Sequence, residues 1–367
     1  MTNISSYSQY QRMLNDTTRL QRQQVTLNSQ ASSGKVGTVI GDLGVEARRS
    51  VNIRSVTEQL DTYKDNIAGV KLYASVMDTA MSKMTDLLND LRNEYSKMSS
   101  DLSTNGTSAI PDTTFLNELG KRGMEELQNL LNTKVEGRYV FAGNDIHNAP
   151  VPDVNGLFAA FQAEMTANLP GAATAAQQAD MITNLKSYVG LPNTTLASIP
   201  VATNPPQAYL GGAGTSGLYS TSLQQSGGAT MIARVDIDRQ VSYGLRADAP
   251  VFQDMFRALA TAATITCPPG NLDGYKALLS DGFAATRSSI TGLSNEVGKL
   301  GITRKEIEDI DQKHDSVITS LTVALGDVED VDMAVVATKL QQNNVALEAT
   351  YKIIAQAKSL SLINFLS

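Results

Sequence analysis

One stretch, residues 52–102, constrains the fold more than any other part of the chain. From Ile53, alternate steps of three and four residues reach only apolar or aromatic side chains up to Leu102. A seven-residue repeat held for about seven heptads is typical of a helix packed along its whole length as a coiled coil. At 1.5 Å per residue, such a helix is about 75 Å long. We therefore predict an elongated, mainly α-helical coiled-coil rod, with one long helix in a globular bundle as the alternative. The predicted rod seam consists of Ile53, Val56, Leu60, Ile67, Val70, Met77, Met81, Met84, Leu88, Leu91 and Met98.

Weaker repeats of the same spacing lie near both ends of the chain. At the start, Thr17 and Gln24 interrupt an otherwise apolar seam, and the last helix is expected to run from about Met333 into "SLSLINFLS" at 359–367. An amphipathic helix alone has no surface on which to bury its seam, and isolated helices are marginally stable. We therefore expect these ends to become buried on assembly. The expected assembly interface consists of Met13, Leu20, Leu27, Ala31, Leu340, Leu347, Ile354, Leu360, Leu362, Ile363, Phe365 and Leu366.

Turn-forming residues divide the chain into nested segments. Glycine-containing breaks are expected at 32–35, 37–44 and 326–332, and a helix is expected after Pro111. Heptad spacing returns between Ile290 and Leu325. This nested layout places the two terminal helices together.

The range 146–249 has a different character, because it is rich in Pro, Gly and Ser. Short strands are expected at 137–143, 231–237 and 240–245. We predict three domains: 1–44 with 326–367 as a terminal-helix coiled coil, 45–145 with 250–325 as a helical rod, and 146–249 as a small mixed α/β or β insert.

No residue pattern supports catalysis, a cofactor or a metal. Gly212, Gly214 and Gly217 match the dinucleotide motif, but a proline-rich segment precedes them where a strand is needed. The two histidines are too far apart in sequence to suggest a zinc site, and Cys267 has no neighbouring base. The acidic residues just before the last predicted helix are explained by the dipole of that helix. The methionines of the heptad seam are explained by packing. These acidic residues are Asp327, Glu329, Asp330 and Asp332. We predict that the protein is not an enzyme.

The charge pattern and the N-terminal sequence limit the partners and the route of export. The net charge of −7 is spread without a basic block, which argues against nucleic acid and anionic membranes as partners. The start "MTNISSYSQYQRML" lacks the pattern of a cleaved signal peptide, and no apolar run is long enough to span a bilayer. We therefore expect no membrane insertion, and export, if it occurs, by another route.

Several longer stretches resemble the flagellin superfamily, the subunits of the bacterial flagellar filament and its junctions. The likeness covers about 1–145 and 250–367, and the final "LSLINFL" is most similar to the subunits that join the hook to the filament. The matching stretches are "SQASSGK" (29–35), "GRYVFAGNDIHNAPV" (137–151), "LGITRKEIEDI" (300–310), "LGDVEDVDMAVVATKL" (325–340) and "ALEATYKIIAQAKSLSLINFL" (346–366).

This resemblance implies a structural, extracellular role in the flagellum. The terminal helices would form an inner layer, the rod a second layer and 146–249 an outward domain. The implied partners are copies of the chain in a ring or tube, a neighbouring hook-associated protein, flagellin, an export chaperone and the flagellar type III apparatus. Two alternatives remain open: a filament-forming flagellin, and a surface module that binds a ligand through 146–249.

Overall fold

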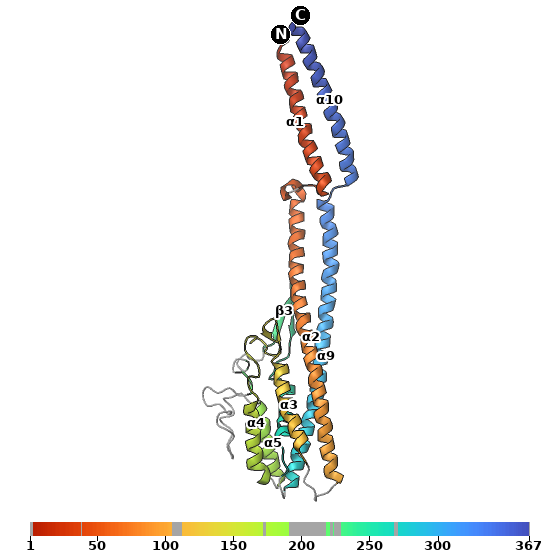
Figure 1. Cartoon of the computed structure of the whole chain (residues 1–367). Coiled ribbons are helices and arrows are strands. Elements are labelled where there is room, and N and C mark those ends of the chain that lie inside the picture. The colour runs from red at the N-terminus through yellow and green to blue at the C-terminus, as the bar shows by residue number, and fades with distance from the viewer. Residues whose placement is uncertain are drawn as a thin grey trace. The chain divides into compact units, whose positions relative to one another are not determined.

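The computed structural model describes residues 3–37, 39–104, 112–171, 174–190, 218–220, 223, 229–267 and 271–366. Most of these residues are helical, as Figure 1 shows, so the prediction of a mainly α protein with long helices and a small strand-containing region is confirmed. The α-helices are α1 (Asn3–Ser33), α2 (Ala47–Thr104), α3 (Thr114–Leu131), α4 (Asn155–Asn168), α5 (Ala175–Gly190), α8 (Pro250–Thr264), α9 (Leu272–Glu329) and α10 (Met333–Leu366). The 3₁₀ helices of the described residues are η1 (Ile40–Glu46) and η3 (Leu169–Gly171).

In the part of the chain that the structure describes, two antiparallel hairpins supply the strands. Strand β1 (Lys134–Val135) pairs with β2 (Arg138–Tyr139), and β3 (Met231–Asp236) pairs with β4 (Arg239–Tyr243). In the second hairpin Met231 lies opposite Tyr243, and the register shifts between Arg234 and Asp236. The two strands expected near 231–245 are therefore present, whereas only two residues of 137–143 form a strand.

The chain divides into two compact units. We call residues 1–62 with 312–367 the terminal unit, and residues 63–311 the central unit. Helices α2 and α9 each contribute residues to both. None of the described helices is long and apolar enough to cross a membrane.

The central unit has one large hydrophobic core, to which α2 contributes a continuous apolar stripe. Heptad spacing keeps this stripe on one face of the helix, where α3, α8 and α9 supply its packing partners. The buried α2 residues in this core are Tyr73, Ala74, Met77, Ala80, Met81, Met84, Leu88, Leu91, Tyr95 and Met98. Tyr95 also donates a hydrogen bond from Oη to the carbonyl oxygen of Ala258, at 2.8 Å, which satisfies its buried hydroxyl.

Helices α3 and α8 approach so closely that a glycine is required between them. A Cβ atom added at Gly120 would overlap the backbone nitrogen of Ala263 and lie 2.7 Å from the carbonyl oxygen of Leu259. One turn later, Gly123 faces the Leu259 side chain. Without a side chain on α3, the two backbones can lie side by side.

The described part of residues 146–249 shares the core of the central unit. Helices α4 and α5 pack against α8, and the buried side chains of Phe161 and Tyr188 belong to the same cluster as Phe252. Helix α8 is buried on all sides, so it offers apolar surface to α4 and α5, which are too short to enclose a core of their own. The glycine motif at 212–217 lies outside the described residues.

The expected breaks are present, and the one at 326–332 is shorter in the structure. Helix α1 ends at Ser33, where Gly34 takes a φ of 70°, a conformation that glycine adopts without strain. The break expected at 326–332 begins only after Glu329, because Gly326 is accommodated within α9. A helical glycine costs about 1 kcal/mol relative to alanine, which is too little to end a long packed helix.

Candidate assembly interface

The terminal unit contains an antiparallel pair formed by the first and last helices. In Figure 1, α1 and α10 lie side by side, and the two ends of the chain lie together. Thr17, Leu27, Val336 and Asn343 are buried. The described side chains predicted for the assembly interface are buried at Leu27 and half-buried at Met13, Leu20, Ala31, Leu340, Leu347 and Ile354.

The last five residues predicted for the interface lie in the C-terminal part of α10. Leu360, Leu362, Ile363, Phe365 and Leu366 lie at helical positions of α10. Their side chains are outside the described part of the chain. Their role in assembly stays a prediction.

Polar side chains connect the paired helices. Gln24 Nε2 donates to Asn344 Oδ1 at 2.8 Å, and Asn343 Nδ2 donates to Gln24 Oε1 at 2.7 Å and to the Leu20 carbonyl oxygen at 3.0 Å. Gln21 Nε2 donates to Tyr351 Oη at 2.9 Å. The seam is therefore fixed by polar contacts as well as by apolar packing.

Apolar side chains also remain exposed on the outer faces of this pair. Val25 is 69% exposed, Val345 62% and Ile353 50%. Two helices bury only one face of each other, so the remaining apolar surface is available to a further partner. Through this exposed apolar surface, copies of the chain can associate.

The two chain crossings that join the terminal pair to the rest of the terminal unit are bonded to each other. Val36 N donates to the Glu329 carbonyl oxygen at 2.7 Å, and Val331 N donates to the Gly34 carbonyl oxygen at 2.9 Å. Lys35 Nζ lies 2.5 Å from Asp330 Oδ1. This bridge aligns the end of α1 with the start of α10.

Glu329 is the buried centre of this crossing. Its carboxylate accepts hydrogen bonds from Ser50 Oγ at 2.5 Å, Arg54 Nε at 2.9 Å and Arg54 Nη2 at 2.7 Å. The hydrogen bonds from Arg54 and Ser50 lower the pKa of Glu329, and the same contact raises the pKa of Arg54. The bidentate geometry favours the ionised carboxylate.

Replacing Glu329 with glutamine is expected to loosen the crossing at neutral pH. The folded state lowers the pKa of Glu329, so its stabilisation is present above the unfolded pKa, near 4.3, and is lost as the pH falls through the folded value. Because Arg54 is largely exposed, we expect a loss of only about 1 kcal/mol, seen as roughly fivefold faster hydrogen exchange at the Val36 and Val331 amides.

The native chain and Glu329→Gln should converge in acid, because both then lack the charge. Lys305→Gln is the matched control, since the ion pair of Lys305 with Asp309 is exposed and remote in sequence from the crossing. A difference at the two amides that persists unchanged at low pH would show that the Glu329 charge is not the cause.

The residues of the predicted rod seam are divided between the terminal unit and the central unit. Ile53 and Leu60 are buried in the terminal unit, and the seam residues from Ile67 to Met98 are buried in the central unit. Val56 differs, because its side chain is 43% exposed.

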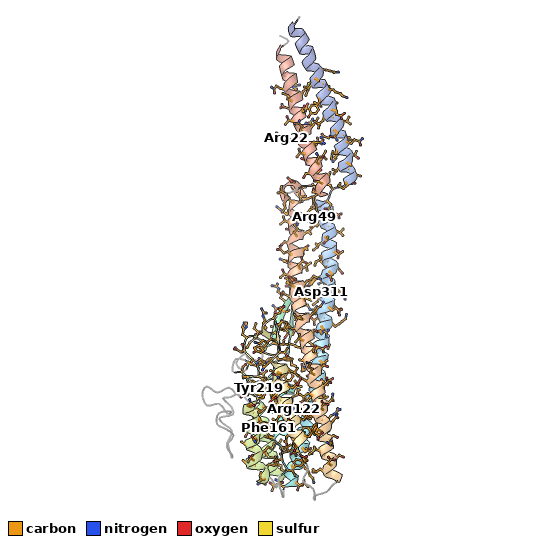
Figure 2. All side chains as sticks on the ribbon, in the orientation of Figure 1. Arg22, Arg49, Arg122, Phe161, Tyr219 and Asp311 are labelled. Atoms are coloured by element: carbon orange, nitrogen blue, oxygen red, sulfur yellow. The ribbon has the colours of Figure 1, made fainter. Side chains whose placement is uncertain are left out.

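Ion pairs that the sequence did not predict lie beside this seam. Asp311 on α9, labelled in Figure 2, lies 3.1 Å from Lys64 Nζ and 2.6 Å from Lys71 Nζ on α2. Burial alone would raise the pKa of Asp311, but the hydrogen bonds from Lys71 and Lys64 outweigh it and lower the pKa. Opposite charges on two distant segments gave no local signal by which these partners could be paired.

The residues considered for catalysis or metal binding are scattered. His147 is exposed and His314 is buried. Cys267 is half-buried, and burial raises the pKa of its thiol. Within the described residues, no group of three His, Cys, Asp or Glu side chains could hold a metal ion.

Long helices and a paired N- and C-terminal helix define a class of helical proteins whose ends carry apolar surface for association. The family model for the bacterial flagellin N-terminal helical region matches residues 4–145, and that for the C-terminal helical region matches residues 283–366. Together these matches cover more than half of the chain. The chain therefore belongs to the flagellin family and is a structural subunit of the bacterial flagellum.

Comparison with individual proteins adds little to this assignment. A solved structure from Vibrio parahaemolyticus, provisionally described as a flagellar hook-associated protein, has 11% identity and a TM-score of 0.40, and the match covers 76% of this chain and 97% of that one. A likeness at this level carries no argument about fold or role. No curated protein matches the chain in sequence.

Proposed function

We propose that this flagellin-family subunit joins the flagellar hook to the filament. The observation that carries the junction role is the C-terminal stretch "LSLINFL" at 360–366, which resembles junction subunits more than filament subunits. The paired terminal helices and their exposed apolar faces support a subunit that packs against neighbouring copies. A ring or tube of such subunits would bury the faces that the single chain leaves exposed.

Within the assembly we propose three layers. Residues 1–44 and 326–367 would form the inner layer, 45–145 and 250–325 the rod layer, and 146–249 the outward part. Neighbours would be a hook-associated protein on one side and flagellin on the other. This division concerns contacts between subunits and is compatible with 146–249 sharing a core with the rod helices in one chain.

We further propose that the protein reaches the outside of the cell through the flagellar type III apparatus with the help of a chaperone. The apolar seams of the terminal helices support this proposal, because they need a protective partner before assembly. Cells that lack the export apparatus should retain the protein inside. Its release from such cells at the normal level would contradict this route.

Deleting the gene tests the junction role. We expect hooks without filaments and flagellin released into the medium, since the first flagellin subunits would lack a surface on which to assemble. Electron microscopy of the cells and immunoblots of the medium measure the two effects. Restoring the gene on a plasmid is the control, and normal filaments in the deletion strain would refute the proposal.

The second candidate is a filament-forming flagellin, with which the matches of both flagellin family models agree equally well. That role predicts long helical polymers from the purified protein alone. A junction subunit should instead give short polymers or none. Negative-stain microscopy of the purified chain at high concentration separates the two roles.

A further inference from the structure

The seam between α1 and α10 alternates apolar and polar layers. The contact between Gln24 and Asn343 fixes which residues face each other, and equal steps in opposite directions along the antiparallel helices pair the rest. The layers are Met13 with Ile354, Thr17 with Thr350, Leu20 with Leu347, Gln24 with Asn343, Leu27 with Leu340 and Ala31 with Val336. Every second layer of the first four is therefore polar.

The two polar layers are built differently. Thr17 Oγ1 donates to the Met13 carbonyl oxygen and Thr350 Oγ1 donates to the Ala346 carbonyl oxygen, both at 2.8 Å and both within one helix. The hydroxyl groups are thus satisfied whichever helix lies opposite. This threonine layer places no demand on the partner helix.

The Gln24–Asn343 layer does make such a demand. Asn343 is only 4% exposed, and its amide nitrogen donates two hydrogen bonds that cross to α1. Its Oδ1 is buried without a hydrogen-bond partner among the described residues. A buried amide with one unsatisfied atom makes this layer costly, so losing the hydrogen bond to Gln24 as well would be strongly unfavourable.

The apolar layers alone cannot select one alignment. A slip of one heptad in one direction would place Leu347 opposite Leu27 and Asn343 opposite Ala31. A slip in the other direction would place Leu347 opposite Met13 and Asn343 opposite Thr17. Leu347 still meets an apolar side chain in both cases, whereas Asn343 loses its hydrogen bond to Gln24 in both.

We propose that Asn343, paired with Gln24, sets the register between the first and last helices, and that the backbone bridge at Val36 and Val331 does not set it alone. A single buried asparagine in a coiled-coil seam specifies alignment at a cost in stability. In a homo-oligomeric assembly, a fixed register also fixes which part of each outer apolar face meets the neighbouring subunit. This inference does not depend on whether the subunit serves the junction or the filament.

Disulfide cross-linking in the full-length chain tests the register. In a Cys267→Ser background, Leu347→Cys is combined with Leu20→Cys to report the native register, or with Leu27→Cys to report a slip of one heptad. Each pair is made with and without Asn343→Leu. Intramolecular disulfide is quantified by mass spectrometry after mild oxidation, both in purified protein and in flagella isolated from cells.

With Asn343 present, we expect the native pair to cross-link at least about tenfold more than the slipped pair. Asn343→Leu should reduce this preference to below about threefold while leaving thermal stability equal or higher, because an apolar residue replaces a costly polar one. The equal or higher stability separates register selection from simple disruption of the helix pair. Thr350→Val is the matched control and should leave the preference unchanged, since its hydroxyl bonds only within α10.

Three results would overturn the proposal. The first is an unchanged preference in Asn343→Leu. The second is equal cross-linking of both pairs with Asn343 present, and the third is no cross-linking of the native pair in either sample.

Discussion

A chain that lacks residues 340–367 is expected to lose incorporation into flagella completely, while its central unit stays folded. The deletion removes the half-buried seam residues Leu340, Leu347 and Ile354 and the buried Asn343, so the facing seam of α1 loses its partners. An unpaired amphipathic helix is marginally stable in water. The central unit, residues 63–311, contains none of the deleted residues and keeps its core.

Adding purified protein from outside to cells that lack the gene measures this effect without a contribution from export. Full-length protein should restore filament growth, whereas the truncated chain should restore none and should be more soluble at high concentration. Glu348→Gln, a change at an exposed position of α10, is the matched control and should behave as the native chain. Restoration by the truncated chain would contradict the assignment of α10 to the assembly interface.

Limited proteolysis should likewise cut both ends of the free chain before residues 53–102.

The long helices could be predicted because their signal is local and repeated. In α2, the apolar stripe from Ile67 to Met98 follows directly from heptad spacing, and the side chains at these positions are buried. Val56 shows the limit of this reasoning, since spacing identifies a seam but does not show whether a partner covers each position. The ends of the helices depended on cumulative packing, so Gly326 did not end α9.

Helices α4, α5 and α8 were not predicted, for a physical reason. The many turn-forming residues between 146 and 249 dominated the local signal, and α8 is buried on all sides, so it lacks the polar face that marks an amphipathic helix. Its partners come from distant parts of the chain. Only the tertiary core reveals why these short helices are stable.

The candidate interface was predictable in its apolar part and not in its polar part. Leu27 and Leu340 follow from spacing, but Gln24 appeared only as an interruption of its seam, and Asn343 was not predicted at all. Their meaning depends on facing each other across more than 300 residues of sequence, as the hydrogen bond between them shows. The same holds for Glu329 with Arg54.

Gly120→Ala is expected to destabilise the central unit by about 2–3 kcal/mol, even though alanine is the better helix former. The added Cβ would overlap the backbone nitrogen of Ala263 and crowd the carbonyl oxygen of Leu259, and neither can move without displacing α8. For a unit of this size, the change corresponds to a fall of roughly 5–10 °C in the melting temperature, measured by circular dichroism. Gly298→Ala is the matched control, because a Cβ there meets nothing within 4 Å. That variant should gain up to about 1 kcal/mol from helix propensity.

A second glycine on α3 separates a backbone collision from a side-chain collision. A Cβ at Gly123 would lie 2.5 Å from Leu259 Cδ2 and 3.2 Å from Leu87 Cδ1, which are side-chain atoms. Leu259→Ala should therefore offset part of the cost of Gly123→Ala, whereas it should not offset the cost of Gly120→Ala, which arises mainly from the α8 backbone. A double-mutant cycle with each glycine measures this difference as a coupling energy. Equal coupling of Leu259 to both positions, or a stabilising Gly120→Ala, would show that α8 can move away from α3 and that the close approach of the two backbones is not fixed by the core.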